Sequence, residues 1–473
     1  MNDALFRNFR IVDETGDFFG SILVEDGLIK KIIPTDAQAS GDSQMPSNGE
    51  FSTIIDGDNS LLLMPAFIDL HAHFRDTGNL EKEASLPAGN SFPSGNSFPS
   101  ETVESGCLAA VAGGFGTVVC MANTKPPTDT AEKALAVRER ACALGLIDLY
   151  PVLPLTKNME GRELVKIATS PATFAAAYRP LLLSEDGKDI ADDGIFLQAM
   201  QQAKEAGIPI SCHCDFGGPE AQAAKAAGKP RREWSRIEEN NAVRRAIDLG
   251  KRAGCHVHIA HVSTAEAVQI IRQAKQENAH SGFTLTCEAT PHHLWATEED
   301  AARMGDESFG RVNPPLRSET DRKSLVAALF DGTIDAIATD HAPHSQTDKA
   351  AGSPGFSGLE TAFAATFSNL AHNAPPQANP LMLISRLMSA TPARILGLDS
   401  GQGGRGRITN RAAVGLRADF AIIDTNAQWK VDPAQFKSRG KCSPFAGREF
   451  RGRVVMTVTK GKIVYDGGSN GYR

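Results

Sequence analysis

The sequence lacks any run of about 18 apolar residues, so it predicts no membrane-spanning helix. Its first residues, Met1 to Arg7, hold no basic segment followed by an apolar run, and we expect no secretory signal. No basic cluster accompanies the net charge of −7, which argues against nucleic acid as a partner. The absence of targeting signals predicts a cytoplasmic protein.

Eight cysteines are present, but their positions do not suggest a disulfide framework. Most of them fall inside apolar helical or strand-like stretches, and without an export signal we expect reduced thiols. Cys212 and Cys214 flank His213 with a spacing that metal sites use, yet no second pair accompanies them. We therefore favour cysteines that are reduced and bind no metal.

Both ends of the chain are predicted to form short β-strands. The N-terminal part, residues 1–60, includes Ile22–Ile33, two apolar runs around an Asp-Gly turn. The C-terminal part, residues 396–473, includes the strand-like runs Ala418–Asp424 and Arg453–Val458. Neither end is long enough for a convincing core of its own. We therefore expect the two ends to combine into one small β-sandwich domain.

The region between them, residues 61–395, alternates short apolar strands with helical patterns, which is typical of βα units. The expected strands are Ala66–Leu70, Gly116–Met121, Ile147–Leu153, Phe174–Leu183, Ile208–Cys212, His256–Ala260, Phe283–Cys287 and Ile334–Thr339. The clearest helical patterns are Glu101–Gly113, Thr130–Gly145, Asp193–Gly207, Ser235–Gly254 and Thr264–Asn278. Eight such units predict an α/β fold, a (β/α)8 TIM barrel. An open doubly wound sheet is the alternative, but no glycine-rich phosphate-binding loop follows the first strand.

A tandem repeat follows the first predicted strand. The six residues Gly-Asn-Ser-Phe-Pro-Ser occur at 89–94 and again at 95–100. We favour a duplication in a tolerant surface loop. The alternative is a lid or a partner contact made through Phe92 and Phe98.

His71 and His73 stand at the end of the first predicted strand. Residues two apart share a face of a strand, so both imidazoles can bind one divalent metal. Four further metal-ligating side chains follow other predicted strands, namely Asp186, His213, His261 and Asp340. Catalytic groups of barrels collect at this C-terminal end of the strands. Nitrogen and oxygen ligands in this number suit Zn²⁺ and suffice for two ions with a bridging carboxylate.

The other strand histidines have a structural interpretation. His256 and His258 lie an odd number of residues from His261, so on a regular strand they face the opposite side. His292 and His293 follow the seventh strand, where they either touch the site or shape the loop. We favour the second alternative for this pair.

The segment Met64–Arg75 resembles the opening motif of the cyclic amidohydrolases, members of the amidohydrolase superfamily. Further segments narrow the resemblance to the dihydroorotases of the bacterial class I type. These segments are Ala112–Pro126, Val257–Thr264, Val312–Arg317, Ala338–His344 and Ser443–Gly447. The likeness covers almost the whole chain, and these motifs together are highly specific.

The resemblance implies one or two zinc ions and an enzyme that interconverts N-carbamoyl-L-aspartate and dihydroorotate in pyrimidine biosynthesis. It implies that His71 and His73 bind one zinc and that His213 and His261 bind the other. Asp186 matches the aspartate that bridges the metals in this class. Hydantoinases, dihydropyrimidinases and allantoinases use a carboxylated lysine near this strand instead, and the fourth predicted strand has no lysine.

Asp340 would bind the first zinc and act as the general acid and base. Arg75 would hold the substrate carboxylate in a bidentate pair. The positions that match substrate contacts are His73, Arg75, Asn123, Asn313, His344, Pro354 and Gly355. Amide hydrolysis needs a nucleophile and a polarised carbonyl, which a metal-bound water and the metal itself supply.

The chain departs from the family pattern in four places. Ala122 replaces a proline, and Arg75–Gly78 replaces the commoner Arg-Glu-Pro-Gly. Residues 213–215 replace His-Cys-Glu, and Pro354-Gly355 replaces Phe-Gly. None of these differences removes a predicted metal ligand.

Two other functions compete with an active dihydroorotase. A non-catalytic homologue would serve as a structural partner of aspartate transcarbamoylase, but such proteins lose metal ligands and here all six positions are occupied. A hydantoinase-like or allantoinase-like amidohydrolase is disfavoured by the missing lysine and by the motifs around Asn313 and His344. The resemblance also suggests a homodimer and leaves aspartate transcarbamoylase as a possible partner of the enzyme itself.

Overall fold

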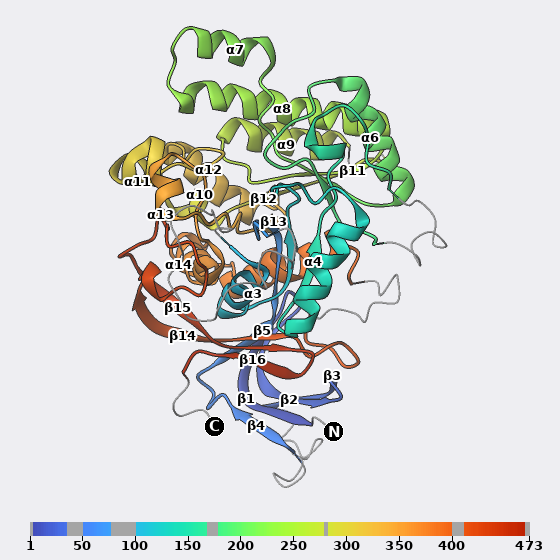
Figure 1. Ribbon diagram of the computed structural model, residues 1–473. Helices are drawn as coiled ribbons and strands as arrows, with labels where there is room; N and C mark the ends of the chain where they lie inside the picture. The colour runs from blue at the N-terminus through green and yellow to red at the C-terminus, as the bar shows by residue number, and fades with distance from the viewer. Residues whose placement is uncertain are drawn as a thin grey trace, which may run out of the picture.

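A computed structural model describes residues 3–35, 51–76, 101–167, 178–278, 282–399 and 411–468. Figure 1 shows a small β-sheet below a larger part made of strands and surrounding helices. Within these ranges no helix is long and apolar enough to cross a membrane. All eight cysteines are free, as the sequence predicts. The tandem repeat at 89–100 lies outside the described residues.

The larger part is a closed barrel of parallel strands. Its strands are β6 (Phe67–Ala72), β7 (Phe115–Cys120), β8 (Asp148–Pro151), β9 (Leu183–Ser184), β10 (Ile210–Cys212), β11 (His256–Ile259), β12 (Thr284–Ala289) and β13 (Ala336–Ile337). They pair in the order β6-β7-β8 and β9-β10-β11-β12-β13. Parallel bridges from Leu153 to Leu183 and from Ala72 to His341 join the two runs. The predicted (β/α)8 barrel is therefore confirmed.

The fourth strand is much shorter than predicted. The sequence predicts Phe174–Leu183, whereas β9 holds only Leu183 and Ser184 because only these two residues pair with β10. Residues 174–177 lie outside the described ranges. The Tyr178 hydroxyl donates instead to the Pro151 carbonyl, 2.5 Å away. An apolar stretch that packs without pairing has the same composition as a strand, so composition alone does not predict which of the two forms.

The predicted helices are present as α3 (Val103–Ala112), α4 (Ala131–Leu144), α6 (Asp193–Ala206), α8 (Arg231–Ala253) and α9 (Ala265–Glu277). Polar N-cap residues explain several starts, since the Thr130 and Thr264 hydroxyls accept from the backbone three residues on. Left-handed glycines end α4, α6 and α8. The remaining helices are α7 (Gly218–Ala226), α10 (Pro291–Trp295), α11 (Glu298–Met304), α12 (Glu319–Phe330), α13 (Gln346–Ala350), α14 (Ala362–Asn373), α15 (Pro380–Ser385) and α16 (Thr391–Ile395).

The small sheet contains strands from both ends of the chain, as predicted. These are β1 (Ala4–Val12), β2 (Asp17–Glu25), β3 (Leu28–Pro34), β4 (Thr53–Asp56), β5 (Leu62–Pro65), β14 (Phe420–Lys430), β15 (Glu449–Thr459) and β16 (Lys462–Asp466). The sheet order is β16-β15-β14-β5-β1-β2-β3, with β4 beside β1. Asp26 and Gly27 form the β2–β3 turn with positive φ angles. The domain boundaries at residues 60 and 396 stay predictions.

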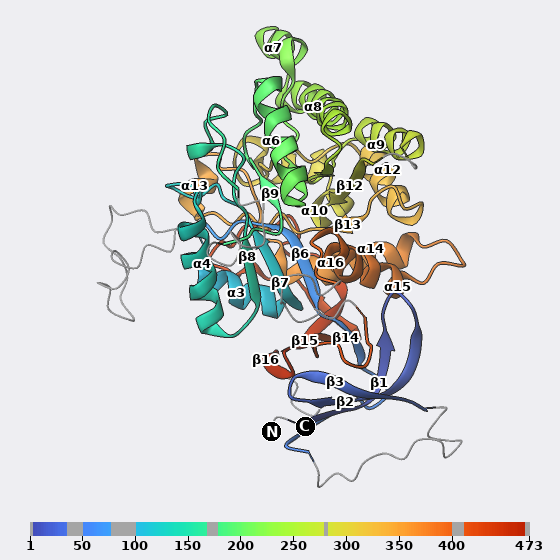
Figure 2. The ribbon, with the colours of Figure 1, turned by 90° about the vertical axis from the view of Figure 1, so that its right-hand side faces the viewer.

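The small sheet lies against the N-terminal end of the barrel strands. The chain runs from β5 directly into β6, and this connection joins the two parts. Both views show the small sheet at one end of the larger part (Figure 2). Phe67 of β6 stacks on Phe363 of α14 with ring centroids 5.7 Å apart, and it meets Phe115 edge-on. The opposite, C-terminal end of the strands is therefore free to form a site.

Candidate functional site

The C-terminal ends of five barrel strands bring the six predicted metal ligands together. We call these six residues the histidine–aspartate cluster: His71, His73, Asp186, His213, His261 and Asp340. All six residues are buried. Five of them form two groups that share His71, one with His73 and Asp340 and the other with Asp186 and His261, and the ligand atoms of each group lie within 4.8 Å of one another. His213 joins them through its Nδ1, which lies 2.8 Å from His261 Nε2. The loops after β9, β10, β11 and β13 thus meet the end of β6.

The distances place Asp186 at the centre of the cluster. Its Oδ1 lies 3.2 Å from His71 Nε2 and 3.2 Å from His213 Nδ1, and its Oδ2 lies 3.6 Å from His73 Nε2. Asp340 Oδ1 lies 3.1 Å from His73 Nε2 and 3.7 Å from His71 Nε2. Both carboxylates therefore face His71 of β6 and His73, which follows β6.

Two members of the cluster have left-handed backbones. His261 has a φ of 32° and Asp340 a φ of 44°, a region that residues other than glycine rarely adopt. Such strain persists where the surrounding structure imposes it, and it is often found at active sites. His261 lies two residues after β11 and Asp340 three residues after β13, and each turns its side chain into the cluster.

The electrostatics of the cluster favour ionised aspartates. Burial opposes ionisation of Asp186, but the neighbouring His71 and His213 outweigh it and hold its pKa well below the usual value. The pKa of Asp340 is lowered in the same way, because burial opposes its ionisation but His73 and His71 favour it more strongly. Burial and the charges of His213 and His71 lower the pKa of His261 to about 3. His261 is thus a neutral imidazole, the form that binds metals.

The cluster also contains polar atoms that a cation would satisfy. Among the described residues, His71 Nε2 and Asp186 Oδ1 are buried atoms without a hydrogen-bond partner, although they lie 3.2 Å apart. Buried polar atoms normally have partners. An imidazole nitrogen and a carboxylate oxygen facing one point are the donors that a divalent metal uses. The residues present therefore fit a metal ion.

The other ring nitrogens of His71 and His73 each have their own partner. His73 Nδ1 lies 2.9 Å from Asn123 Oδ1, and Asn123 Nδ2 donates to Asp186 Oδ2 at 2.8 Å. His71 Nδ1 lies 3.1 Å from Glu288 Oε1. Asn123, a predicted substrate contact, thus bonds to two members of the cluster in this structure.

Two of the buried acidic residues at the site were not predicted. Burial opposes ionisation of Glu288, but His258 and His71 lower its pKa to about 2. Asp69 accepts from the Thr339 backbone at 2.8 Å and so fixes the residue before Asp340. The sequence signals are that Asp69 is the one acidic residue of the predicted strand Ala66–Leu70 and that Glu288 directly follows the predicted strand Phe283–Cys287.

Arg75 and His344 form the polar edge of the cluster. Arg75 Nη2 lies 3.3 Å from His344 Nε2, while its buried Nε has no partner among the described residues. His344 Nε2 also lies 2.9 Å from the Pro354 carbonyl oxygen. Burial, together with the charge of Arg75, lowers the pKa of His344 to about 4. An unpaired buried guanidinium edge beside a neutral histidine suits an anionic ligand.

The remaining predicted substrate contacts, Asn313 and Gly355, have hydrogen-bond partners outside the cluster. The Asn313 side chain accepts a hydrogen bond from Arg231. Gly355 donates its N–H to Arg311 O at 3.0 Å, and its carbonyl accepts from Lys349 Nζ at 3.0 Å. In the described part of the chain, no hydrogen bond links Asn313 or Gly355 to the cluster.

His293 and His256 agree with their structural interpretation, whereas the buried Nε2 of His292 has no hydrogen-bond partner among the described residues. His293 lies 2.8 Å from Thr290 Oγ1 and 3.1 Å from Pro314 O, so it shapes the loop before the next helix. His256 bonds to Thr286, outside the cluster. His258 does not enter the cluster, but it contacts Glu288 and thereby connects with His71.

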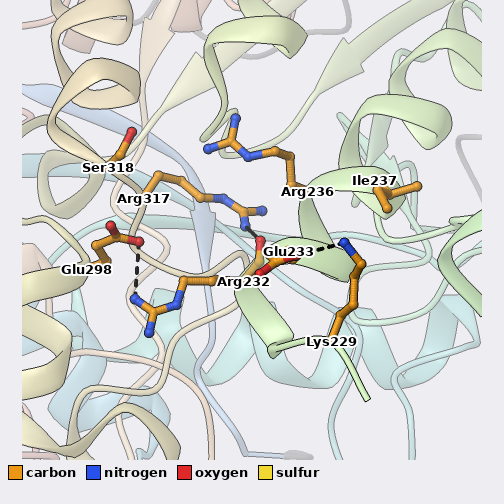
Figure 3. Close-up of a pocket in the computed structure, with 8 residues that line it drawn as sticks. All are labelled: Lys229, Arg232, Glu233, Arg236, Ile237, Glu298, Arg317 and Ser318. Carbon is orange, nitrogen blue, oxygen red and sulfur yellow. Dashed lines mark hydrogen bonds and ion pairs between the residues drawn. The ribbon is translucent and has the colours of Figure 1, made fainter. Parts of the chain in front are cut away.

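A separate pocket of about 420 Å³ lies beside α8 and contains none of the predicted site residues (Figure 3). Each cation that lines it already has an acidic partner. The pairs are Lys229–Glu233, Arg232–Glu298, Arg236–Asp321 and Arg317–Glu239. The pocket therefore offers no unpaired charge to a ligand.

Comparisons with known proteins show which family and which relatives this chain is similar to. The model of the amidohydrolase family matches residues 62–464. The dihydroorotase of Clostridium botulinum (strain Eklund 17B / Type B) is 36% identical over 98% of this chain and 99% of its own. The dihydroorotase of Anaeromyxobacter dehalogenans (strain 2CP-C) is 34% identical over 99% of each chain.

Among solved structures, the L-hydantoinase (dihydropyrimidinase) from Arthrobacter aurescens is similar with a TM-score of 0.78. It is 26% identical and covers 99% of this chain and 97% of its own. The dihydropyrimidinase from Brevibacillus agri NCHU1002, with a TM-score of 0.75 and 20% identity, shares the fold over 99% of this chain and 96% of its own.

Proposed function

The chain belongs to the amidohydrolase family, and from this premise we propose that it is a dihydroorotase. It hydrolyses the cyclic amide of (S)-dihydroorotate to N-carbamoyl-L-aspartate, and in reverse it closes the ring with loss of water, a step of pyrimidine biosynthesis. The observation that supports this most is the buried histidine–aspartate cluster at one end of the barrel. Full-length relatives named dihydroorotase support the choice of substrate.

We propose Zn²⁺ as the metal, because the donors are imidazole nitrogens and carboxylate oxygens. His71, His73 and Asp340 would hold one ion. His213 and His261 would hold a second, with Asp186 between the two. The contacts of Asp186 with His71 and His213 support its bridging role.

Bound zinc would lower the pKa of water and polarise the amide carbonyl. The protein's contribution to proton transfer is Asp340. Its carboxylate is ionised at neutral pH, so it accepts the proton of the attacking water. It then donates that proton to the ring nitrogen as the amide C–N bond breaks, and ring closure follows the same path in reverse.

We assign the orientation of the substrate to Arg75 and His344, the polar edge of the cluster. Arg75 and His344 bind the carboxylate of dihydroorotate, for which the partnerless Nε of Arg75 is a donor. His73, Asn123, Asn313, Pro354 and Gly355 complete the proposed substrate contacts. Asn123 would then bind substrate while also holding His73 and Asp186.

The test is substrate discrimination by the purified protein. We expect turnover of dihydroorotate and N-carbamoyl-L-aspartate, and little or none of hydantoin, dihydrouracil or allantoin. Turnover of hydantoin in preference to dihydroorotate would favour the hydantoinase alternative, to which the Arthrobacter aurescens structure is similar. Bound zinc without turnover of any of these amides, both for the chain alone and with aspartate transcarbamoylase added, would contradict the proposal.

Three properties stay predictions of the resemblance: a homodimer, association with aspartate transcarbamoylase, and a cytoplasmic location. Size-exclusion chromatography with light scattering, with and without the transcarbamoylase, would test the first two. A chain that gains turnover only on adding the transcarbamoylase would show that the enzyme needs its partner.

A further inference from the structure

His71 of β6 has an anionic neighbour on the side away from the cluster. Its Nε2 faces Asp186, while its Nδ1 lies 3.1 Å from Oε1 of Glu288 on β12. Both side chains are almost completely buried, at 1% exposure each. Water therefore cannot replace this contact if it is broken.

The second oxygen of Glu288 is held by another histidine. His258 Nε2 on β11 lies 3.0 Å from Glu288 Oε2, and His258 Nδ1 lies 2.9 Å from Thr286 Oγ1. Within the described ranges, no lysine or arginine pairs with Glu288. A buried carboxylate needs such hydrogen bonds to offset the loss of its hydration. The two histidines therefore fix both oxygens of Glu288.

This geometry determines the proton position on His71. A carboxylate only accepts hydrogen bonds, so it favours the tautomer with hydrogen on Nδ1. The lone pair then lies on Nε2, the atom that points into the cluster. Hydrogen bonding to a carboxylate also raises the basicity of a metal-binding imidazole.

We propose that Glu288, held by His258, is a positioning residue that prepares His71 to bind the metal. The inference rests on the metal-dependent activity proposed above, and it adds a residue to which the family resemblance gave no role. His73 differs, because its Nδ1 faces the neutral amide of Asn123. Of these two histidines, His71 is thus the one with negative charge behind its ring.

The substitution Glu288→Gln tests this inference with little change in shape. The amide oxygen can accept from only one of the two histidines, while the amide nitrogen must face the other. The negative charge beside His71 is lost in either arrangement. We expect the zinc dissociation constant to rise about 10- to 100-fold, as for other residues that support metal ligands. His258→Gln should weaken zinc binding in the same direction but less, because Glu288 itself remains.

Zinc affinity would be measured on the full-length, metal-stripped protein by competition with a chromophoric chelator, together with the visible spectrum of the Co²⁺ form. Asp419→Asn is the matched control, since Asp419 is a buried carboxylate of the small sheet that pairs with Arg417. We expect it to lower thermal stability without changing zinc affinity. A merely structural Glu288 would give the same result as this control.

The outcomes separate this inference from the proposed function. Weaker zinc binding and a changed Co²⁺ spectrum in Glu288→Gln would support it. Wild-type affinity in both Glu288→Gln and His258→Gln would overturn it, even if the enzyme is a dihydroorotase. If Glu288→Gln does not fold, His258→Gln decides by the same measurement. A wild-type chain that binds no zinc would instead overturn the proposed function.

Discussion

At the residue scale, the proposed reaction depends most on Asp340. Asp340→Asn keeps the size of the side chain but removes the group that moves the proton. We expect kcat to fall by about 10²- to 10⁴-fold, the usual contribution of a general acid and base. Steady-state kinetics in both directions would measure this loss, with zinc content determined on the same sample.

Asp331→Asn is the control for that experiment. Asp331 is an exposed carboxylate at the C-terminal end of α12 that pairs with Arg272 and belongs to neither the cluster nor its polar edge. It should leave kcat unchanged. Equal kcat values for Asp340→Asn and the wild type would show that another group transfers the proton.

Arg75 has a separable role in binding. Arg75→Lys keeps one positive charge but loses the planar pair of donors that matches a carboxylate. We expect KM for dihydroorotate to rise about 10- to 100-fold, since hydrogen bonds to charged groups contribute about 1.5–3 kcal/mol. Arg138→Lys, which alters a cation above the Tyr150 ring, is the control. An unchanged KM would remove Arg75 from the substrate site.

At the element scale, Glu239 of α8 stabilises the loop that follows β11. It accepts from the Ser263 and Thr264 backbones at 2.8 and 3.0 Å and pairs with Arg317 at 3.0 Å. Glu239→Gln leaves the buried Arg317 guanidinium without its counter-charge. We expect the free energy of unfolding to fall by about 3–5 kcal/mol. Denaturant unfolding of the metal-free protein would measure it.

The adjacent residue provides the control. Glu238 pairs with Lys225, whose side chain is 43% exposed. Exposed ion pairs contribute about 0–1 kcal/mol, so Glu238→Gln should change stability little. If the two substitutions cost the same, the buried pair does not hold the loop as we describe.

Local patterns allowed most elements to be predicted, together with the end of the barrel at which the six candidate metal ligands lie. The His-x-His spacing defines a strand face, and barrel strands deliver their terminal residues to one end. The length of the fourth strand could not be predicted, because the extent of pairing depends on β10 and not on local composition.

Contacts between residues that are far apart in the sequence could not be predicted either. His71 and Glu288 are 217 residues apart, and Asp69 and Thr339 are 270 apart. Neither pairing has a local signal, apart from an acidic residue in or just after a predicted strand. The contact between His73 and Asn123, 50 residues apart, likewise depends on the assembled site.

At the scale of the whole molecule, the metal would connect strand ends from both pairing runs of the barrel. Binding to the folded state alone stabilises a protein by about 2.7 kcal/mol at a free concentration 100 times the dissociation constant. We therefore expect chelation to lower Tm and added zinc to raise it in proportion to the logarithm of its free concentration. Differential scanning calorimetry would measure this, with Mg²⁺ as the control cation. A Tm that does not respond to zinc would contradict a metal site at the barrel end.

The central claim is that this barrel is a metal-dependent dihydroorotase. Its most direct test is the hydrolysis of dihydroorotate by one preparation, first stripped of metal and then restored with measured amounts of zinc. The account predicts no turnover in the stripped protein and recovery that saturates at one or two zinc ions per chain. Full turnover by the stripped protein, or none after zinc has bound, would contradict it.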